Sequence, residues 1–393
     1  VVGFGAEFLD RPADGLEADF ATRRAPEPKD GAAMSRFVQL EGRLTLTGAN
    51  ADRRVRVRDA HLAAVATALL HEIAVARRVG PLAADAGMAQ ALAPFTLATV
   101  AGMAGLPPEL LSGLADELVA ARGRAVVVAG GSASESPTGP ALETAVLLLN
   151  LSLDAFTTGL VEDGAGPDPA DGGAAGLAAL VADMNAGKVK TLLVAGANPA
   201  YDAPASLGVA EALAKVPFVV SVNDRLDETS RLADLLAPAS HPFECWSDAA
   251  LPRGVFAVQQ PSIRPLYDTR GLLDLVLAWG AAAGATGAVA DAAVSTAPKP
   301  GAAPGTPVPN PSPAWHYVRG QWAEHLGAEP GTAAFEEKWN EVLRAGQWQG
   351  PAPAAPAARV PAPGAAALLG GLPAPASGLE LQLYPHLATF DGR

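Results

Sequence analysis

The sequence contains a single cysteine, Cys245, in 393 residues. One cysteine cannot form a disulfide within the chain, and it cannot supply the four thiolates of an iron–sulfur cluster. The cysteine count therefore excludes both features from this chain. It leaves the redox compartment open.

Basic residues and long apolar runs are also scarce. The chain has 28 lysines and arginines against 41 acidic residues, a net charge of −13. Nucleic-acid binding needs a basic face, so this balance argues against a nucleic-acid partner. The longest apolar candidate, residues 62–75, is interrupted by Thr67 and by His71-Glu72, whereas a membrane span needs about 18 uninterrupted apolar residues. We therefore expect no membrane span.

Aromatic residues make up only 5% of a chain that is 49% hydrophobic. Its length suffices for two or three domains with a large core. Two apolar runs, at 191–195 and 216–222, bracket a helix-like segment, a pattern typical of a βαβ unit with buried parallel strands. Polar residues follow each run, at the sheet edge where open α/β sheets bind ligands. The sequence therefore predicts an α/β fold with a possible ligand edge.

Composition and periodicity divide the chain into four parts. We predict a first α/β lobe, N-terminally truncated, then a second α/β lobe, then a linker with a small helical insertion, and finally a Pro/Ala-rich irregular segment that starts a further domain. Their ranges are 1–123, 124–285, 286–347 and 348–393. The strand expected to open the further domain is Leu379–Tyr384. On this interpretation the chain is an internal piece of a longer protein.

Residues 315–339 gather five aromatics into 25 positions. Their spacing favours a helical hairpin packed on the main body. A partner surface is the alternative, because exposed tryptophan and tyrosine often anchor interfaces.

Familiar catalytic motifs are incomplete. A Gly-x-Gly start at residues 3–5 has Phe8 where the dinucleotide fingerprint needs glycine, and a Gly-x-Ser-x sequence at 130–133 is followed by Ser134 instead of the elbow's second glycine. The helix that begins His71-Glu72 has Val75 where a zinc-protease helix carries its second histidine. These segments are predicted to be structural.

Acidic residues cluster after the second apolar run, at Asp224, Asp227, Glu228 and Asp234. A cation site is one interpretation, but helix capping explains the pattern better, because such side chains satisfy free amides at helix starts. Cys245 is predicted to be a small buried hydrophobe instead of a nucleophile.

The turn Gly196-Ala-Asn198-Pro199 after a buried strand, followed by Glu228-Thr229, Ala233-Asp234 and a Leu-Ala-Pro strand ending at Pro238, resembles the molybdopterin oxidoreductase superfamily of the dimethyl-sulfoxide-reductase type. The resemblance spans most of residues 1–285. It implies two Rossmann-like parallel-sheet lobes.

By this resemblance, the residues nearest a pterin would lie at the edge of the second lobe. The candidates, read as vestigial cofactor-binding positions, are Gly196, Asn198, Pro199, Asp224 and Thr229. No catalytic residue and no metal ligand is identified in the chain.

A narrower resemblance is carried by Glu244-x-Trp246-x-Asp248, Gln260-Pro261, the segment 315–319 and the closing residues 390–393. These resemble the large iron–sulfur subunit of bacterial alternative complex III, a quinol:electron-acceptor oxidoreductase. The resemblance implies a molybdopterin-enzyme-like body without the cofactor, and iron–sulfur clusters in a C-terminal part beyond this chain. It further implies multihaem cytochrome partners in a membrane complex on the periplasmic side of the bacterial inner membrane.

One departure bears on that choice. Catalytic relatives carry a Pro-Gly-Thr-Asp turn that touches the pterin, where this chain has residues 58–61, Arg-Asp-Ala-His. The change removes backbone amides suited to phosphate. Two alternatives stay open: a catalytic enzyme of the polysulfide or thiosulfate reductase kind that holds bis-molybdopterin guanine dinucleotide, and a central thiamine-diphosphate-enzyme domain.

Overall fold

The computed structural model describes residues 1–10, 16–25, 34–161, 173–251, 254–288, 312–350, 361–362, 364–374 and 378–384. The chain forms two compact units. Unit 1 comprises Val1–Asp163 and Pro356–Arg393, and unit 2 comprises Gly164–Ala355. Unit 2 is therefore inserted in the sequence of unit 1. The linker residues 289–311 and the closing residues 390–393 lie outside the described part.

Unit 1 is built on a parallel four-stranded sheet of order β3-β2-β1-β4. Its strands are β1 (Val2–Phe4), β2 (Val38–Glu41), β3 (Arg53–Arg56) and β4 (Val127–Ala129). The two inner strands β1 and β2 are buried along their whole length, as expected for strands covered on both faces. The edge strand β3 alternates arginine with a buried valine.

The position of β4 corrects the expected lobe boundary at Gly123. Val127 pairs with Val2 in parallel register, so β4 belongs to the first sheet. The segment up to residue 161 thus lies in unit 1. Local periodicity identifies a strand but does not show which strand it pairs with. The lobe boundary expected at Gly123 is therefore wrong.

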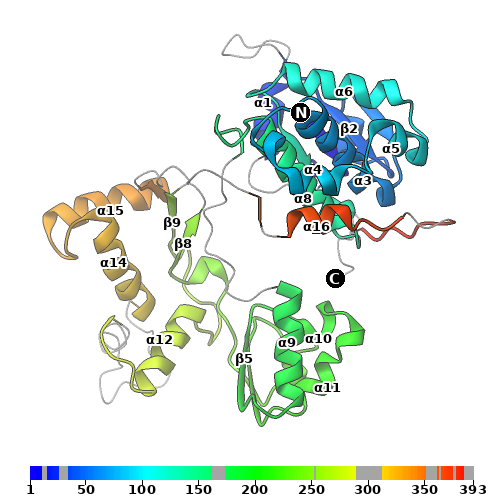
Figure 1. Cartoon of the computed structure of the whole chain (residues 1–393). Coiled ribbons are helices and arrows are strands. Elements are labelled where there is room, and N and C mark those ends of the chain that lie inside the picture. Colours follow the sequence, from blue (N-terminus) through cyan, green and yellow to red (C-terminus); the bar gives the residue numbers. More distant parts are fainter. Residues whose placement is uncertain are drawn as a thin grey trace, which may run out of the picture. The chain divides into compact units, whose positions relative to one another are not determined.

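Helix α3 (Asp59–Leu70) is the central core helix of unit 1 and continues as the π-helical turn η1 (His71–Ala76). Leu62, Leu69 and Ile73 are fully buried on it. Figure 1 shows α16 (Ala365–Gly370) beside α4 (Ala86–Leu92) and α8 (Gly139–Ser152), although α16 is far away in sequence. The other helices are α1 (Leu16–Arg23), α2 (Leu46–Ala49), α5 (Leu97–Ala104), α6 (Pro108–Ala120) and α7 (Gly131–Ser134).

Two helical stretches of unit 1, Asp59–Ala76 and Ala86–Ala104, are long and apolar enough to cross a membrane by length and composition alone. The first is 72% buried inside the protein, as a core helix is. The second is 22% buried and is divided into α4 and α5. The expectation of no membrane span stays a prediction.

Unit 2 contains two sheets. The parallel sheet β5-β6-β7 comprises β5 (Thr191–Ala195), β6 (Phe218–Val222) and β7 (Leu235–Leu236), and it carries α9 (Gly173–Asn185), α10 (Pro199–Asp202) and α11 (Val209–Leu213). The antiparallel sheet β10-β9-β8 comprises β8 (Ser247–Leu251), β9 (Val255–Gln259) and β10 (Gln347–Gln349). Helix α12 is Leu272–Ala282, α14 is Pro313–Leu326 and α15 is Ala333–Ala345.

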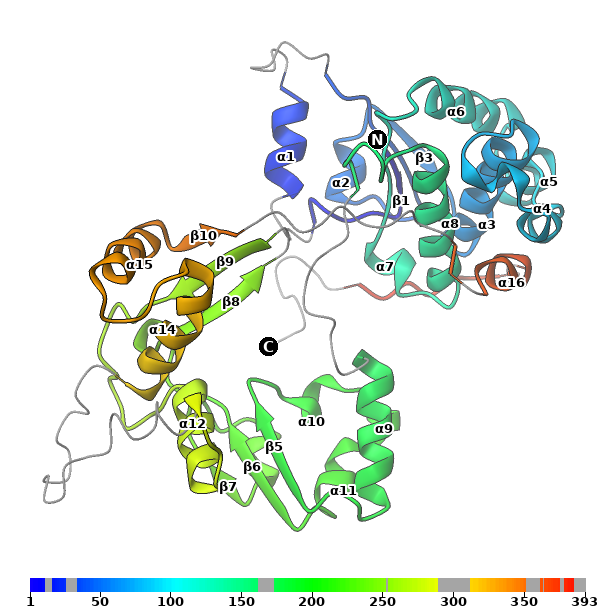
Figure 2. The ribbon, with the colours of Figure 1, turned by 60° about the vertical axis from the view of Figure 1, so that its left-hand side comes forward.

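The predicted helical hairpin is confirmed as α14 and α15, which pack on the antiparallel sheet (Figure 2). Trp322, Phe335 and Trp339 are at most 2% exposed and form the centre of this core. The indole Nε1 of Trp322 donates to Asp248 on β8 at 3.0 Å, and Trp246 stacks on Trp339. Most of these aromatics are therefore core residues and not a partner surface.

The strand expected at Leu379–Tyr384 is not observed. The segment has no strand assignment and pairs with none of the described strands.

The buried Asn150 of α8 should be essential for unit 1. Its side chain donates to the carbonyl of Val127 at 2.7 Å and accepts from the amide of Val127 at 2.8 Å. Asn150→Ala leaves two buried backbone groups of β4 unsatisfied, and we expect it to lower the free energy of unfolding by about 2–4 kcal/mol. The control Leu147→Ala, at a side chain 51% exposed on the same helix, should change it by about 1 kcal/mol or less.

Urea unfolding can assign the loss to one unit. All six tryptophans lie in unit 2, at positions 246, 279, 315, 322, 339 and 348. Asn150→Ala should therefore shift the circular-dichroism transition and leave the tryptophan-fluorescence transition in place. Equal shifts in both signals would contradict this assignment.

Candidate functional site

The carboxyl edge of the unit 1 sheet is the first candidate. The chain passes from β1 to β2 on one side, whereas β4 lies on the other side of β1, which makes the β1–β4 junction a topological switch point. Gly5 follows β1, and Gly130 and Gly131 follow β4, all with positive φ. Helices start beside these turns, and open α/β folds bind anionic ligands at such helix starts.

The carboxylate of Glu7 fills the space beside α7. Glu7 is 6% exposed, and its Oε1 accepts from the hydroxyl of Ser132 at 3.0 Å and from its amide at 3.3 Å. Arg43 forms an ion pair with the same oxygen at 2.6 Å. A Cβ at Gly131 would lie 2.4 Å from Cγ of Glu7. Glycine is therefore required at position 131, because Glu7 occupies the position beside it.

A second carboxylate, Asp10, occupies the start of α2. Its two oxygens accept from the amide of Leu46 at 2.8 Å and from the amide and hydroxyl of Thr47 at 3.0 and 2.8 Å. The N-cap Thr45 satisfies Gly48 in the same turn. The free amides of this helix start are thus satisfied by the chain itself.

A third carboxylate, Glu380, reaches α3 from the C-terminal part of unit 1. Its Oε1 accepts from the amide of Ala60 in the first turn of α3 at 2.8 Å. Next to it, Oδ1 of Asp59 accepts from the amide of Gly42 at 3.2 Å. Burial, with Glu380 and Glu7 nearby, raises the pKa of Asp59 to about 6, against the effect of the Gly42 hydrogen bond.

The carboxyl edge of the parallel sheet in unit 2 contains the predicted cofactor-edge residues. Gly196 follows β5 with φ +62°, and Pro199 starts α10. The Oδ1 of Asn198 accepts from the amide and hydroxyl of Thr229 at 3.1 and 2.7 Å, and its Nδ2 donates to Glu228 at 2.7 Å. The hydroxyl of Thr229 in turn accepts from the amide at position 200. The structure therefore brings Gly196, Asn198, Pro199 and Thr229 together.

Asp224, the fifth predicted residue, does not join this group. It is exposed and pairs with Arg225 at 2.8 Å, whose hydrogen bond lowers the pKa of Asp224. The residue that does join is Asn223, directly before it. Its Nδ2 donates to the carbonyl of Ala197 at 3.0 Å and to Asp227 at 2.8 Å.

Sequence reasoning assigned no role to Asn223, although its place directly after β6 was a signal for it. Its Oδ1 is buried and has no partner among the described residues.

The capping prediction for the acidic cluster is confirmed for Asp227, which accepts from the amide of Ser230 at 2.7 Å. Burial by itself raises the pKa of Asp227, but the hydrogen bonds from Ser230 and Asn223 outweigh this effect, so its pKa is lowered overall. Asp234 instead binds the amide of Val219 on β6.

Neither Cys245 nor a metal cluster provides a reactive centre in the described part of the chain. Burial raises the pKa of the Cys245 thiol, which keeps it protonated near neutral pH and unsuited to nucleophilic attack. Within the described residues, no group of three or more His, Cys, Asp or Glu side chains could hold a metal ion.

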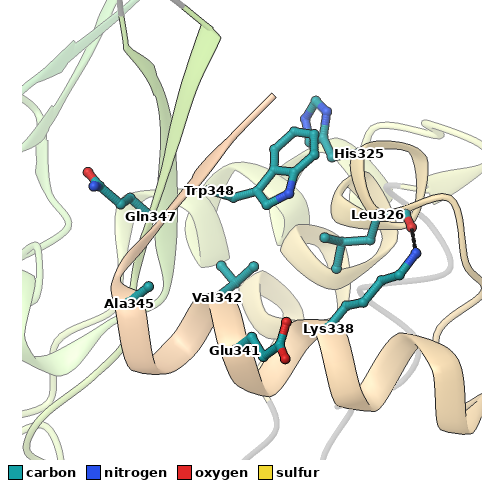
Figure 3. Close-up of a pocket in the computed structure, with 8 residues that line it drawn as sticks. All are labelled: His325, Leu326, Lys338, Glu341, Val342, Ala345, Gln347 and Trp348. Atoms are coloured by element: carbon teal, nitrogen blue, oxygen red, sulfur yellow. Dashed lines mark hydrogen bonds between the residues drawn. The ribbon is translucent and has the colours of Figure 1, made fainter. Parts of the chain in front are cut away.

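A pocket of about 430 Å³ lies between the end of α14, α15 and β10 (Figure 3). Trp348 and His325 line it on one side, and Lys338 and Glu341 of α15 on another. Lys338 donates to the carbonyl of Leu326 at 2.6 Å, so its ammonium is engaged at the end of α14. The pocket offers an aromatic wall without an evident reacting group.

Both units belong to the α/β class. Each has a parallel sheet with helices at its carboxyl edge, as in doubly wound nucleotide-binding lobes. The expected fold class, α/β with two Rossmann-like parallel-sheet lobes, is confirmed.

Comparison with known proteins relates the chain to molybdopterin oxidoreductases. The chain is 29% identical over 277 residues to the "Menaquinone reductase, molybdopterin-binding-like subunit" of Nitratidesulfovibrio vulgaris. This match covers 65% of the chain and 39% of the relative. The chain is also 37% identical over 87 residues to the arsenate respiratory reductase molybdopterin-containing subunit ArrA of Shewanella sp., covering 21% of this chain and 10% of the relative. No protein-family model matches the sequence.

Among solved structures, acetylene hydratase from Pelobacter acetylenicus has a similar fold, with a TM-score of 0.58. The match has 12% identity and covers 81% of this chain and 48% of that protein. The sequence relatives confirm the resemblance to the molybdopterin oxidoreductase superfamily, and the solved structure shows a shared fold. The chain spans less than half the length of each of these proteins.

The Asn198–Thr229 contact should hold the unit 2 edge together. Asn198→Ala removes the acceptor of two buried donors, and we expect a loss of about 2–3 kcal/mol in the free energy of unfolding. Asp224→Asn, at the exposed residue beside the site, should change it by about 0.5 kcal/mol or less. The tryptophan-fluorescence transition in urea measures both, and equal effects of the two variants would refute the assigned network.

Asp59 should make unit 1 less stable as the pH rises. Its pKa is raised from 3.8 to about 6 in the folded protein, so between about pH 4 and pH 6 the folded state keeps a proton that the unfolded chain loses. Stability falls with rising pH through this window. Asp59→Asn keeps an acceptor for Gly42, and we expect it to raise stability at pH 8 by about 1–2 kcal/mol. At pH 4 the gain should disappear; a gain equal at both pH values would contradict the raised pKa.

Proposed function

We propose that the chain is a cofactor-free, molybdopterin-oxidoreductase-like scaffold within the iron–sulfur subunit of a respiratory quinol:electron-acceptor oxidoreductase of the alternative complex III kind. In support, the relative from Nitratidesulfovibrio vulgaris is named as a molybdopterin-binding-like subunit of a menaquinone reductase. The Glu-x-Trp-x-Asp motif at 244–248 also has a structural role here, because Trp246 and Asp248 both contact the aromatic core. On this proposal the chain is not itself catalytic.

The observation that carries the proposal is the set of carboxylates at the helix starts of unit 1. A molybdopterin guanine dinucleotide carries a pyrophosphate, and in doubly wound lobes a pyrophosphate binds helix N-termini. Glu7, Asp10 and Glu380 already accept the hydrogen bonds of those helix starts. Two like charges 4 Å apart repel by about 4 kcal/mol near a protein surface. The residues of the unit 1 edge therefore do not fit a phosphate-bearing cofactor.

The unit 2 edge supports the proposal more weakly. Thr229 donates to Asn198, Asn198 donates to Glu228, and Asn223 donates to Asp227 and to the carbonyl of Ala197. These contacts stabilise a strand-to-helix turn without a ligand. The retained Gly196-Ala-Asn198-Pro199 turn is then explained by its structural role.

The remaining parts of the proposal concern the whole protein. The single cysteine of the chain means that iron–sulfur clusters would be held by a C-terminal part outside it. A multihaem cytochrome and other subunits of a membrane complex would be its partners, on the periplasmic side of the bacterial inner membrane. These assignments rest on the sequence resemblance.

A catalytic molybdopterin enzyme of the polysulfide or thiosulfate reductase kind is the second candidate. Two observations favour it. The relative ArrA is named as molybdopterin-containing, and the buried Oδ1 of Asn223 lacks a partner among the described residues, which leaves one acceptor at the unit 2 edge for a ligand.

Metal analysis of the intact protein separates the two candidates. We expect iron from the clusters and molybdenum far below one atom per chain, because the unit 1 edge repels the phosphates of the pterin cofactor. The measurement is elemental mass spectrometry on protein produced in a host that makes the cofactor. A known molybdenum enzyme from the same host serves as the control. Stoichiometric molybdenum would overturn the scaffold proposal.

A further inference from the structure

Residues 378–384 form an extended segment on the carboxyl edge of the unit 1 sheet. Its even-numbered residues contact the edge, whereas its odd-numbered residues face solvent. Leu379, Leu381 and Leu383 are 106%, 84% and 75% exposed. The segment is therefore held by polar and aromatic contacts alone, and burial of its leucines contributes nothing to them.

The contacts follow the even residues in order. Arg58 donates to the carbonyl of Gly378 and lies 3.7 Å from Glu380, whose Oε1 also accepts from the amide of Ala60 at 2.8 Å. Gln382 lies over Gly42, where an added Cβ would be 3.0 Å from its Nε2. Every second residue thus contacts a loop that follows β2 or β3.

The last contact joins the segment to the Glu7 site. The guanidinium carbon of Arg43 lies 3.9 Å from the centre of the Tyr384 ring, and the same side chain forms the ion pair with Glu7. Two arginines and one helix amide therefore surround this part of the edge, and a carboxylate from 320 residues away already occupies it.

We propose that residues 378–384 are a displaceable internal ligand, in which the Glu380 carboxylate closes an anion-binding corner formed by Ala60, Arg58 and Arg43. The corner accepts a pyrophosphate-type anion once the segment leaves. This inference rests on the proposed function and deepens it, since it assigns part of the loss of cofactor affinity in unit 1, beside the part caused by Glu7 and Asp10, to the 378–384 segment. Asp59 and Glu7 also lie near the corner, and their negative charge weakens the binding of any external anion. Burial, and to a smaller extent Arg58, lowers the pKa of His61, which keeps its imidazole neutral near pH 7.

The test uses the intact protein and two measurements. Hydrogen exchange of the peptide that contains Ala60 reports whether Glu380 covers the helix start, and calorimetric titration with inorganic pyrophosphate reports whether the corner is open. Glu380→Ala should speed exchange at Ala60 about tenfold and give saturable pyrophosphate binding about tenfold tighter than in the unaltered protein. The tighter binding should weaken as salt is added.

Two further variants control the result. Glu324→Ala removes one exposed glutamate from unit 2 and should leave both measurements unchanged. Arg58→Gln should speed exchange at Ala60, because it releases Gly378 and Glu380, but should not improve pyrophosphate binding, because it removes a cation from the corner. Glu380 is on the surface, so its replacement by alanine is not expected to prevent folding; equal circular-dichroism spectra confirm that.

Unchanged exchange at Ala60 in both Glu380→Ala and Arg58→Gln would overturn the proposal. So would pyrophosphate binding that is as tight in the unaltered protein as in Glu380→Ala. Neither result depends on the molybdenum content, so failure of this inference is distinguishable from failure of the proposed function.

Discussion

The free amides at the helix starts of a parallel sheet are the constraint on which the organisation of unit 1 depends. The first turn of a helix has no internal acceptors, and leaving its amides buried and unsatisfied costs about 1–3 kcal/mol for each group. Here the acceptors are carboxylates of the same chain, supplied from the loop after β1 and from a segment beyond α16. The edge is consequently an internal ionic network. Arg43 pairs with Glu7 and Arg58 with Glu380, so these two arginines balance part of its charge.

Unit 2 satisfies the corresponding groups with amide and hydroxyl side chains together with two carboxylates. Asn198 after β5 and Thr229 bond to each other, and Asn223 after β6 bonds to Asp227, which accepts from the amide of Ser230. Unit 2 also has a separate core, where aromatic side chains surround one cation. Arg319 lies over the rings of Trp315 and Phe335 and pairs with Glu336. Such a cation is stabilised by ring faces as well as by its ion pair.

Sequence patterns predict much of this structure, because many of its elements depend on interactions between residues that are close in sequence. Hydrophobic periodicity predicted β5, β6 and the helical hairpin, because these depend on neighbours within a few residues. The Gly-x-Asn-Pro turn and Thr229 were found through a motif. Asp224 stays a predicted cofactor-edge position, but it does not meet the other four, because two adjacent polar residues follow β6 and only Asn223 turns inward.

The lobe boundary and the roles of the edge carboxylates depend on long-range pairing, which local patterns do not show. Nothing near β4 indicates that it pairs with β1, which precedes it by more than a hundred residues. Likewise, Glu7 and Glu380 are ordinary acidic residues in the sequence. Their roles come from Arg43 and Ala60, to which only the folded chain brings them.

The insertion of unit 2 within unit 1 has a consequence for synthesis on the ribosome. Leu369 of α16 is fully buried in the unit 1 core beside α4 and α8, yet it is translated only after all of unit 2. Unit 2 can complete its own core first, while the apolar faces that await α16 stay open for about ten seconds or more at ordinary elongation rates. During that interval the nascent chain presents a surface that chaperones bind, and slower elongation through residues 164–355 would lengthen its exposure.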